Sequence, residues 1–260
     1  MPELPDVEGF RRVFAEHAVN RKVTGVDVRD SGVLRGVTGR RLRETLTGQR
    51  FSEPRRHGKW LLVPVRGRDA TMVLHFGMTG SLHWSDEDPH PHPHDRVIFA
   101  FRDGELRYRD QRKLQGLRLA PDDDALAGLL SGTGPDALTV TRKQLRDLLP
   151  GARQLKPALM DQSVLSGLGN LLSDEILWRA RLHPRRKPRD LDDAEFGRLH
   201  KELRAVLRAA IPTGRVPPRP SWLTGRRDDP SGSCPRCGTT LSHGRVGGRS
   251  TVWCPHCQPG

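Results

Sequence analysis

The chain has 260 residues, enough to bury a sizeable core, and we expect two domains from this length. Its formal net charge of +13 and pI near 10.6 predict a polyanionic partner, nucleic acid before an anionic membrane surface. No apolar run approaches the roughly 18 residues of a membrane span, and the first residues lack the apolar core of a signal peptide. We therefore expect a cytosolic protein with no membrane partner.

The first half of the chain predicts one helix followed by many strands. A helix is expected over residues 6–19, where Val7, Phe10, Val13 and Phe14 recur at helical spacing. Short β-rich runs follow, separated by glycines and by the hairpin signal Asp103-Gly104. These runs cover residues 23–28, 60–65, 71–76, 96–101, 105–109 and 116–120. Their number and spacing predict a β-sandwich or barrel.

The second half predicts helices. An acidic segment at residues 121–124 suggests a domain boundary. Apolar periodicity then predicts helices over residues 124–130, 141–149, 159–165, 170–182 and 191–211. The last of these has the clearest apolar face, and the proline-rich segment that follows it ends the pattern.

Four cysteines near the C-terminus have the spacing of a zinc site. They stand at Cys234, Cys237, Cys254 and Cys257, in the pattern C-x2-C-x16-C-x2-C, whereas a scattered set would have suggested disulfides. Four thiolates complete a tetrahedral shell with no position open for water, so we expect one structural Zn²⁺. Between the pairs, Gly247-Gly248 can turn a hairpin that presents Arg249 outward. In the alternative interpretation the ribbon only stabilises the C-terminus and Arg249 is merely solvated; the spacing does not decide between them.

The N-terminus, Met1-Pro2-Glu3, suggests a nucleophile. A small second residue permits removal of Met1, which would leave a proline secondary amine with a useful neutral fraction at cellular pH. Attack by this amine on a sugar C1′ gives an iminium, which acidifies the C2′ proton and promotes elimination of the neighbouring phosphate. Glu3 could protonate the opening sugar oxygen or shuttle protons. The alternative is a disordered terminus in which a proline starts a helix.

Two further patterns suggest contacts with phosphate. Residues 167–170, Gly-Leu-Gly-Asn, open a predicted helix whose free amides and Asn170 side chain could bind a phosphate, with Lys156 upstream as a further cation. Basic residues, among them Lys59 and Arg112, lie beside predicted strands and add to the positive charge. Taken singly, the glycines could simply end a loop, and the basic residues could be ordinary solvated side chains.

With these residues assembled, the chain resembles the formamidopyrimidine-DNA glycosylase and endonuclease VIII family of base-excision repair enzymes. The resemblance covers nearly the whole length. It is carried by PELPDVE at 2–8, RRHGKWLL at 55–62, LHFGMTGSL at 74–82, LRYRDQRKLQG at 106–116, LKPALMDQSVLSGLGNLLSDEILWRARLHP at 155–184, and RSTVWCPHCQ at 249–258.

The resemblance implies an α+β fold with two domains. Its N-terminal catalytic β-sandwich is flanked by helices, which we expect over residues 1–120. A helical domain with a helix-two-turn-helix follows, expected over 121–225, and then a zinc finger β-hairpin, expected over 226–260. The expected partner is damaged double-stranded DNA, bound by a monomer in the bacterial cytosol or nucleoid.

The resemblance also assigns roles to single residues. Pro2 matches the family's Schiff-base nucleophile and Glu3 its acidic partner. Lys59 matches a lysine near the phosphates of the lesion, and Asn170 and Arg249 match residues that grip the DNA backbone. Three residues fall where the family fills the space left by the extruded base: Met78, Arg112 and Leu114.

The implied activity is that of a bifunctional DNA glycosylase and abasic-site lyase that ends in β,δ-elimination. Three departures affect the lesion: Asp6 replaces a usual glutamate, Leu114 replaces a usual phenylalanine, and residues 219–233 form a short loop without the family's tyrosine, since Tyr108 is the only tyrosine. We therefore expect an endonuclease VIII-like or abasic-site preference rather than 8-oxoguanine. The alternative is a catalytically silent, zinc-dependent protein that binds damaged DNA; a zinc-ribbon RNA-binding protein is a third interpretation.

Overall fold

The computed structural model describes residues 1–86, 90–149 and 151–260. The chain divides into two compact units: unit 1 comprises Met1–Pro2 and Asp6–Ser131, and unit 2 comprises Glu3–Pro5 and Gly132–Gly260. Unit 2 therefore includes three residues from the N-terminus. None of the helices in the described ranges combines the length and the apolar composition that crossing a membrane requires.

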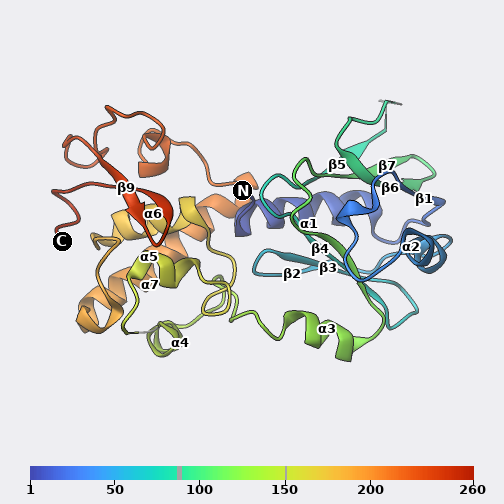
Figure 1. Ribbon diagram of the computed structural model, residues 1–260, viewed down its shortest axis with the longest axis horizontal. Helices are drawn as coiled ribbons and strands as arrows, with labels where there is room; N and C mark the ends of the chain where they lie inside the picture. Colours follow the sequence, from blue (N-terminus) through green and yellow to red (C-terminus); the bar gives the residue numbers. More distant parts are fainter. Residues whose placement is uncertain (87–89, 150) are drawn as a thin grey trace. The chain divides into compact units, whose positions relative to one another are not determined.

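Unit 1 is built on two antiparallel four-stranded sheets (Figure 1). The first has the order β1-β6-β7-β5, with β1 at Gly25–Val28, β6 at Asp95–Phe101, β7 at Gly104–Arg109 and β5 at Ser81–Ser85. The second has the order β2-β3-β4-β8, with β2 at Arg55–His57, β3 at Trp60–Pro64, β4 at Thr71–His75 and β8 at Gly116–Ala120. Side chains of both sheets meet in one buried cluster that includes Phe99, Tyr108, Leu61 and Leu74. The sheets therefore form the predicted sandwich.

Helices cover this sandwich. α1 (Leu4–Ala18) places Val7 and Phe14 in the shared core, and α2 (Gly39–Leu46) follows a short 3₁₀ turn at Ser31–Val33. α3 (Asp123–Leu130) packs Leu126 against Leu62 and Val73 on the outer face of the second sheet. β3 is buried on both faces for this reason, which explains why its sequence is a continuous apolar run rather than an alternating one.

Unit 2 contains four helices and a hairpin among its described residues. The helices are α4 (Arg142–Leu148), α5 (Leu155–Met160), α6 (Asn170–Ala180) and α7 (Asp193–Ala210). Short 3₁₀ turns lie at Pro188–Asp190, Ile211–Thr213 and Leu223–Gly225. The hairpin pairs β9 (Ser242–Val246) with β10 (Arg249–Trp253), and Gly247 and Gly248 turn it with φ of 57° and 75°. The predicted two-domain α+β fold, including the helix-two-turn-helix and the hairpin, is confirmed.

Two local predictions were wrong. The helix expected over 159–165 lies at 155–160 instead, because the Asp161 side chain accepts the N–H of Ser163 at 3.0 Å and starts a turn. The hairpin between β6 and β7 turns at residues 102–103, so that Gly104 begins β7. A Cβ at Gly104 would lie 2.4 Å from the Trp84 ring, so glycine is needed there for close packing. Three elements were not predicted: β2, α2 and β5. β2 and α2 are short and rich in arginine, so their apolar pattern is weak.

Candidate active site

Glu3 is fixed at the start of helix α6. Its side chain is buried, with 1% of its surface exposed. The carboxylate accepts three backbone N–H groups, from Gly169 at 2.8 Å, Leu171 at 2.8 Å and Leu172 at 3.1 Å. These donors and the positive end of the helix dipole favour the ionised carboxylate. The residue next to the proposed nucleophile is therefore anchored by the fold.

Two glycines make room for the N-terminal residues. A Cβ on Gly169 would lie 2.4 Å from Cδ of Glu3, and a Cβ on Gly167 would lie 2.7 Å from Cδ1 of Leu4. The Leu4 N–H also donates to the carbonyl of Gly167 at 3.0 Å. The interpretation of these glycines as a backbone clamp for phosphate needs correction, because Glu3 already occupies the amides that a phosphate would use.

Pro2 precedes this anchor and is partly exposed. Met1, the residue that must leave to free the proline amine, is 46% exposed. A protease that removes methionine can therefore reach it. The fold holds the chain from Glu3 onward and leaves the residues before it accessible.

The hairpin brings Asn170 and the neighbour of Arg249 together. Nδ2 of Asn170 donates to Oγ of Ser250 at 3.3 Å. Oδ1 of Asn170 is buried and has no hydrogen-bond partner within the described part of the chain. Arg249 is exposed at the first position of β10, which fits both a residue presented to DNA and a residue that is merely solvated. Asn170 thus contacts the residue that follows Arg249 in the chain.

Lys156 lies in the interior rather than at the surface. Its side chain has no exposed area, and its ammonium is 2.7 Å from Oδ1 of Asp174. Nζ also donates to the carbonyl of Ser250 at 2.7 Å and to Oγ1 of Thr251 at 2.8 Å. A direct contact with DNA phosphate, as the sequence predicts, would require this group to leave three oxygen atoms.

Opposing influences act on the protonation of Lys156. Burial and then the charge of Arg227 lower its pKa to about 7, while the carboxylate of Glu3 raises it. The ion pair with Asp174 also favours the ammonium. Nζ donates hydrogen bonds to the Ser250 carbonyl and to the Thr251 hydroxyl, whereas Oδ1 of Asp174 lies 2.7 Å away but accepts no hydrogen bond from the described residues.

The predicted void-filling residues stand out in unit 1 by their exposure. Among the described residues, the exposed large hydrophobic side chains are Met1, Met78 at 37% and Leu114 at 49%. Nη1 of Arg112 lies 3.1 Å from Sδ of Met78. Lys113, between Arg112 and Leu114, has φ of 53°, a left-handed conformation that is uncommon for a residue with a side chain. The structure brings the three predicted residues together on two neighbouring loops.

A buried aspartate joins these two loops. Oδ1 of Asp110 accepts the hydroxyl of Thr79 at 2.6 Å and the N–H of Arg112 at 3.1 Å. The same N–H lies 3.0 Å from Oγ1 of Thr79. Because Asp110 has no exposed surface, these contacts are shielded from water and hold Met78 close to Arg112.

Lys59 lies in the turn between β2 and β3 and is mostly buried, with 8% of its surface exposed. It is close enough to His75 to affect its titration. Burial first, and then the charges of Lys59 and Arg118, lower the pKa of His75 to about 4. Nδ1 of the neutral His75 accepts the N–H of Gly77 at 3.0 Å and so supports the loop that carries Met78.

The four cysteines form a compact cluster in unit 2. Their sulfur atoms all lie within 4.8 Å of one another. Four sulfur ligands about 2.3 Å from a zinc ion would lie about 3.8 Å from one another. The sulfur of Cys234 lies 4.0 Å from that of Cys257, and the sulfur of Cys237 lies 3.5 Å from those of Cys254 and Cys257. Nε1 of Trp178 donates to Sγ of Cys234 at 3.3 Å, a contact that stabilises a metal-bound thiolate. The donor set and its spacing fit a closed structural zinc site.

Comparison with known proteins decides the family. Three family profiles match in order: the formamidopyrimidine-DNA glycosylase N-terminal domain over residues 1–117, its H2TH domain over 133–217, and a zinc finger found in FPG and IleRS over 233–260. The chain belongs to the formamidopyrimidine-DNA glycosylase family. The resemblance seen in the sequence is thereby confirmed.

Individual members of this family match along the whole chain. Formamidopyrimidine-DNA glycosylase of Acidothermus cellulolyticus is 36% identical over 286 residues, which cover 100% of this chain and 98% of that protein. The enzyme of Heliobacterium modesticaldum is 36% identical, with 99% and 100% covered. A solved complex of Lactococcus lactis Fpg with DNA containing an abasic site has a TM-score of 0.89 at 29% identity, and each chain is fully covered.

Three residues that lie close to Asn170 were not identified from the sequence. Arg227 and Asp174 form an ion pair, and Ser250 joins them to Asn170. Arg227 looks like its neighbour Arg226 in the run RRDD, so no local pattern distinguishes the two. The adjacent acidic residues Asp174 and Glu175, which lie among apolar residues of this helix, were the available signal.

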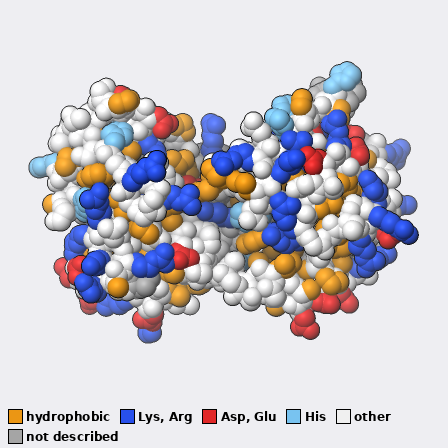
Figure 2. All heavy atoms as spheres, in the orientation of Figure 1, with side chains coloured by type: hydrophobic (Ala, Val, Ile, Leu, Met, Phe, Trp, Pro, Cys, Tyr) orange, Lys and Arg blue, Asp and Glu red, His pale blue; other side chains and the backbone are white. Residues whose placement is uncertain are grey.

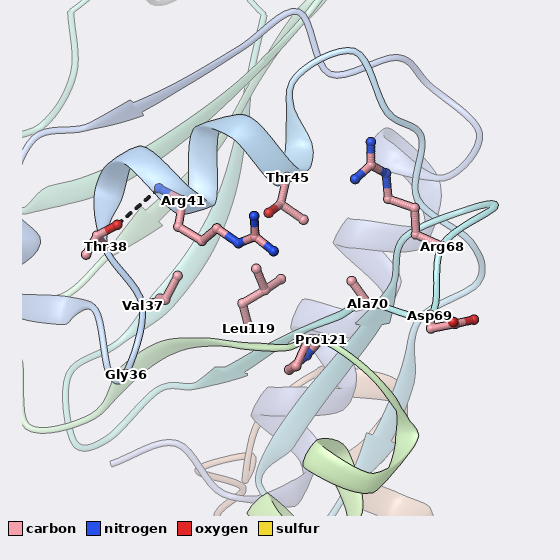
Figure 3. A pocket seen from close by; sticks show the side chains of 10 residues that line it. All are labelled: Gly36, Val37, Thr38, Arg41, Thr45, Arg68, Asp69, Ala70, Leu119 and Pro121. Atoms are coloured by element: carbon pink, nitrogen blue, oxygen red, sulfur yellow. Dashed lines mark hydrogen bonds between the residues drawn. The ribbon is translucent and has the colours of Figure 1, made fainter.

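A separate cavity of about 670 Å³ lies in unit 1 (Figure 3). Arg41, Arg68 and Thr45 line it with apolar residues such as Leu119. None of the predicted site residues lines it.

Lys and Arg side chains are spread over both units on the face that Figure 2 shows. The distribution of positive charge therefore does not by itself identify the residues that bind DNA.

Proposed function

We propose that the chain is a bifunctional DNA glycosylase and abasic-site lyase whose nucleophile is the amine of Pro2 after removal of Met1. The observation that carries this proposal is the anchoring of Glu3 by three backbone amides of unit 2. A disordered terminus, the alternative interpretation of the same residues, does not bury a carboxylate at a helix start. This anchoring instead suits a terminus that takes part in chemistry.

In the proposed reaction, the nitrogen of Pro2 attacks C1′ of the damaged nucleotide. The bond from C1′ to the base breaks, the base leaves with a proton, and the sugar ring opens to an iminium. Loss of the C2′ proton then breaks the bond from C3′ to its phosphate oxygen. A second elimination releases the phosphate at C5′, which leaves phosphates at both ends of a one-nucleotide gap, and water then hydrolyses the iminium to free the sugar-derived aldehyde and the amine of Pro2.

Glu3 has a defined part in this scheme. Three N–H donors hold its carboxylate ionised and in a fixed place next to Pro2, where it can receive a proton from the reacting sugar and return it. We therefore assign Glu3 as a proton shuttle near Pro2. Lys59, Asn170 and Arg249 bind the DNA backbone around the lesion in this proposal.

Extrusion of a base costs a few kcal/mol and leaves a gap that must be filled. Met78, Arg112 and Leu114 are suited to that task because two of them expose large apolar groups and all three occur on linked loops. Met78 and Leu114 are the exposed large hydrophobic side chains of the described residues other than Met1, and their loops are adjacent, so both can contact the same ligand. One structural Zn²⁺ on the four cysteines would hold the hairpin that carries Arg249.

We further propose a preference for oxidised pyrimidines and abasic sites over 8-oxoguanine. Support comes from residues 219–233, which are short and tied down: the N–H of Thr224 donates to Oε2 of Glu175 at 3.1 Å, and Leu223 is fully buried. A loop held in this way is poorly suited to fold over a purine. Solved complexes of Lactococcus lactis Fpg include one with DNA containing Fapy-dG and one with DNA containing an oxidised pyrimidine, so the fold itself is compatible with both classes.

The relatives matched here are bacterial, so we place the activity on the DNA of a bacterial cytosol, carried out by a monomer. The competing function is a silent protein that binds damaged DNA without cutting it. Both functions need the zinc hairpin, but only the enzyme needs a free amine at Pro2.

Trapping with borohydride separates these functions. Protein verified by mass spectrometry to begin at Pro2 should form a covalent adduct with an abasic-site duplex, and Pro2→Gly should weaken trapping strongly. The matched control is the same sequence with Met1 retained, in which the proline nitrogen is an amide. Equal trapping by the free and blocked proteins, or none by the free protein, would rule out the proposed nucleophile.

A panel of duplexes with single defined lesions tests the preference. Base release should be faster from oxidised pyrimidines than from 8-oxoguanine opposite cytosine. The reverse order would contradict the specificity proposed from the short loop without affecting the lyase assignment.

A further inference from the structure

Ser250 links the two residues that we propose to bind the DNA backbone. It follows Arg249 directly, and its hydroxyl accepts the side-chain amide of Asn170 at 3.3 Å. Arg227 also binds Ser250: Nη2 donates to the carbonyl of Ser250 at 2.9 Å and to its Oγ at 2.9 Å. The position of this one serine therefore affects both proposed DNA contacts.

Arg227 itself is fixed by helix α6. Its Nη1 forms an ion pair and hydrogen bond with Oδ2 of Asp174, and the two side chains are 9% and 1% exposed. The N–H of Val252 also points to Oδ2 of Asp174 at 3.4 Å, so the same carboxylate lies against β10. A planar guanidinium can hold the carboxylate and the serine at once with two different nitrogen atoms, whereas an ammonium is a single point of charge.

The neighbouring contacts leave Arg227 a role of its own. Lys156 binds Asp174 and the carbonyl of Ser250, but no contact from Lys156 reaches the Ser250 hydroxyl within the described residues. Arg227 belongs to the 219–233 loop, where Arg226 beside it is exposed. The short loop thus contributes one of its two adjacent arginines to the interior and leaves the other in solvent.

We propose that Arg227 is a positioning residue that sets Ser250, and through it Arg249 and Asn170, in place to bind the DNA backbone at the damaged nucleotide. This inference rests on the proposed function for the identity of the ligand. It also gives the short loop a purpose: it joins the zinc hairpin to helix α6.

Binding to a duplex with a tetrahydrofuran abasic analogue tests the inference without the lyase reaction, because this analogue has no C1′ aldehyde. Arg227→Gln should weaken binding about tenfold, the size of effect expected for a contact that supports two others. Arg226→Gln removes the same charge one residue away and should change affinity by less than about twofold. Zinc content and the unfolding transition, measured for each variant, show that the fold is intact.

A double-mutant cycle separates positioning from general loss of stability. If Arg227 acts through Arg249, then Arg227→Gln should have a much smaller effect in an Arg249→Ala background than alone. Arg227→Lys should not restore affinity, because an ammonium lacks the second, separate nitrogen with which Arg227 reaches the Ser250 hydroxyl while it binds Asp174. Equal effects in both backgrounds, full rescue by lysine, or equal affinities of the Arg226 and Arg227 variants would overturn the inference.

A milder variant covers the case in which Arg227→Gln loses zinc. Ser250→Ala removes only the hydroxyl that joins Arg227 to Asn170 and should weaken binding about threefold with zinc retained; unchanged affinity would again overturn the inference. These binding results can be distinguished from a failure of the proposed lyase activity. Absence of a borohydride adduct in the wild-type protein refutes the proposed nucleophile, while the tetrahydrofuran duplex still reports on Arg227.

Discussion

Replacing Gly169 by alanine should displace Glu3 from its site. Gly169 has φ of −128° and ψ of −158°, an extended conformation that alanine adopts freely, so backbone strain is not involved. The added Cβ would lie 2.4 Å from Cδ, 2.6 Å from Cγ and 2.6 Å from Oε1 of Glu3. Two carbon atoms need well over 3 Å, so the carboxylate has to move.

The cost follows from the hydrogen bonds that are lost. Three N–H groups donate to the carboxylate at 2.8, 2.8 and 3.1 Å. A hydrogen bond to a charged group contributes about 1.5–3 kcal/mol, and water replaces part of this when the helix end is exposed. We therefore expect the free energy of unfolding to fall by about 3 kcal/mol. Misplacement of a reacting group by about 1 Å can cost 10²-fold in rate, so borohydride trapping should slow by about that factor.

Urea unfolding and the rate of trapping measure these two effects in one preparation. Gly132→Ala is the matched control, because a Cβ at Gly132 meets nothing within 4 Å. The reasoning is refuted if Gly169→Ala unfolds and traps like Gly132→Ala. It is also refuted if stability falls while the rate of trapping does not, since Glu3 would then matter only for folding.

Further predictions concern pH, the void-filling residues and the metal. The pKa of His75 is lowered from 6.5 to about 4, so the unfolded chain binds this proton first and His75 should lower the unfolding free energy by about 3 kcal/mol between pH 6.5 and 4. In His75→Asn the fall measured by urea melts over this range should be smaller by about this amount, because the other titrating groups remain; an unchanged pH profile contradicts the assignment. Leu114→Gly should reduce excision of a paired lesion about tenfold while cleavage of an abasic site changes less, because an abasic nucleotide has no base to unstack; equal losses on both substrates speak against void filling. Removing zinc with a chelator should abolish binding to the tetrahydrofuran duplex and restore it on readdition, and unchanged affinity after verified metal loss contradicts the role of the hairpin carrying Arg249.

The sequence predicts much of the fold because local signals and tertiary structure agree in most segments. The helix over residues 191–211 is an example: its apolar face predicts the same element as the packed structure, α7 at Asp193–Ala210, which Asp192 caps. The hairpin at Gly247-Gly248 is another, since two adjacent residues with positive φ require glycine or asparagine. The cysteine spacing predicts the cluster for the same reason, because each C-x2-C pair forms a local turn.

The contacts around Glu3 could not be predicted from the sequence. Residues 3 and 169 are far apart in the chain, and neither the acid nor the glycine shows locally that one fills the space left by the other. The glycines therefore predict a phosphate site, which has the same local pattern of free amides at a helix start. Lys156 was similarly assigned by its charge, whereas its burial depends on Asp174 and the hairpin.

The central claim, that the amine of Pro2 attacks the sugar, is tested most directly by locating the bond. Protein that begins at Pro2 should be trapped on an abasic-site duplex with borohydride, digested with nuclease and trypsin, and examined by tandem mass spectrometry. We predict a sugar-derived mass on the peptide of residues 2–11, attached to the proline nitrogen. A modification on a lysine such as Lys59, with the N-terminal peptide unmodified, would contradict the claim.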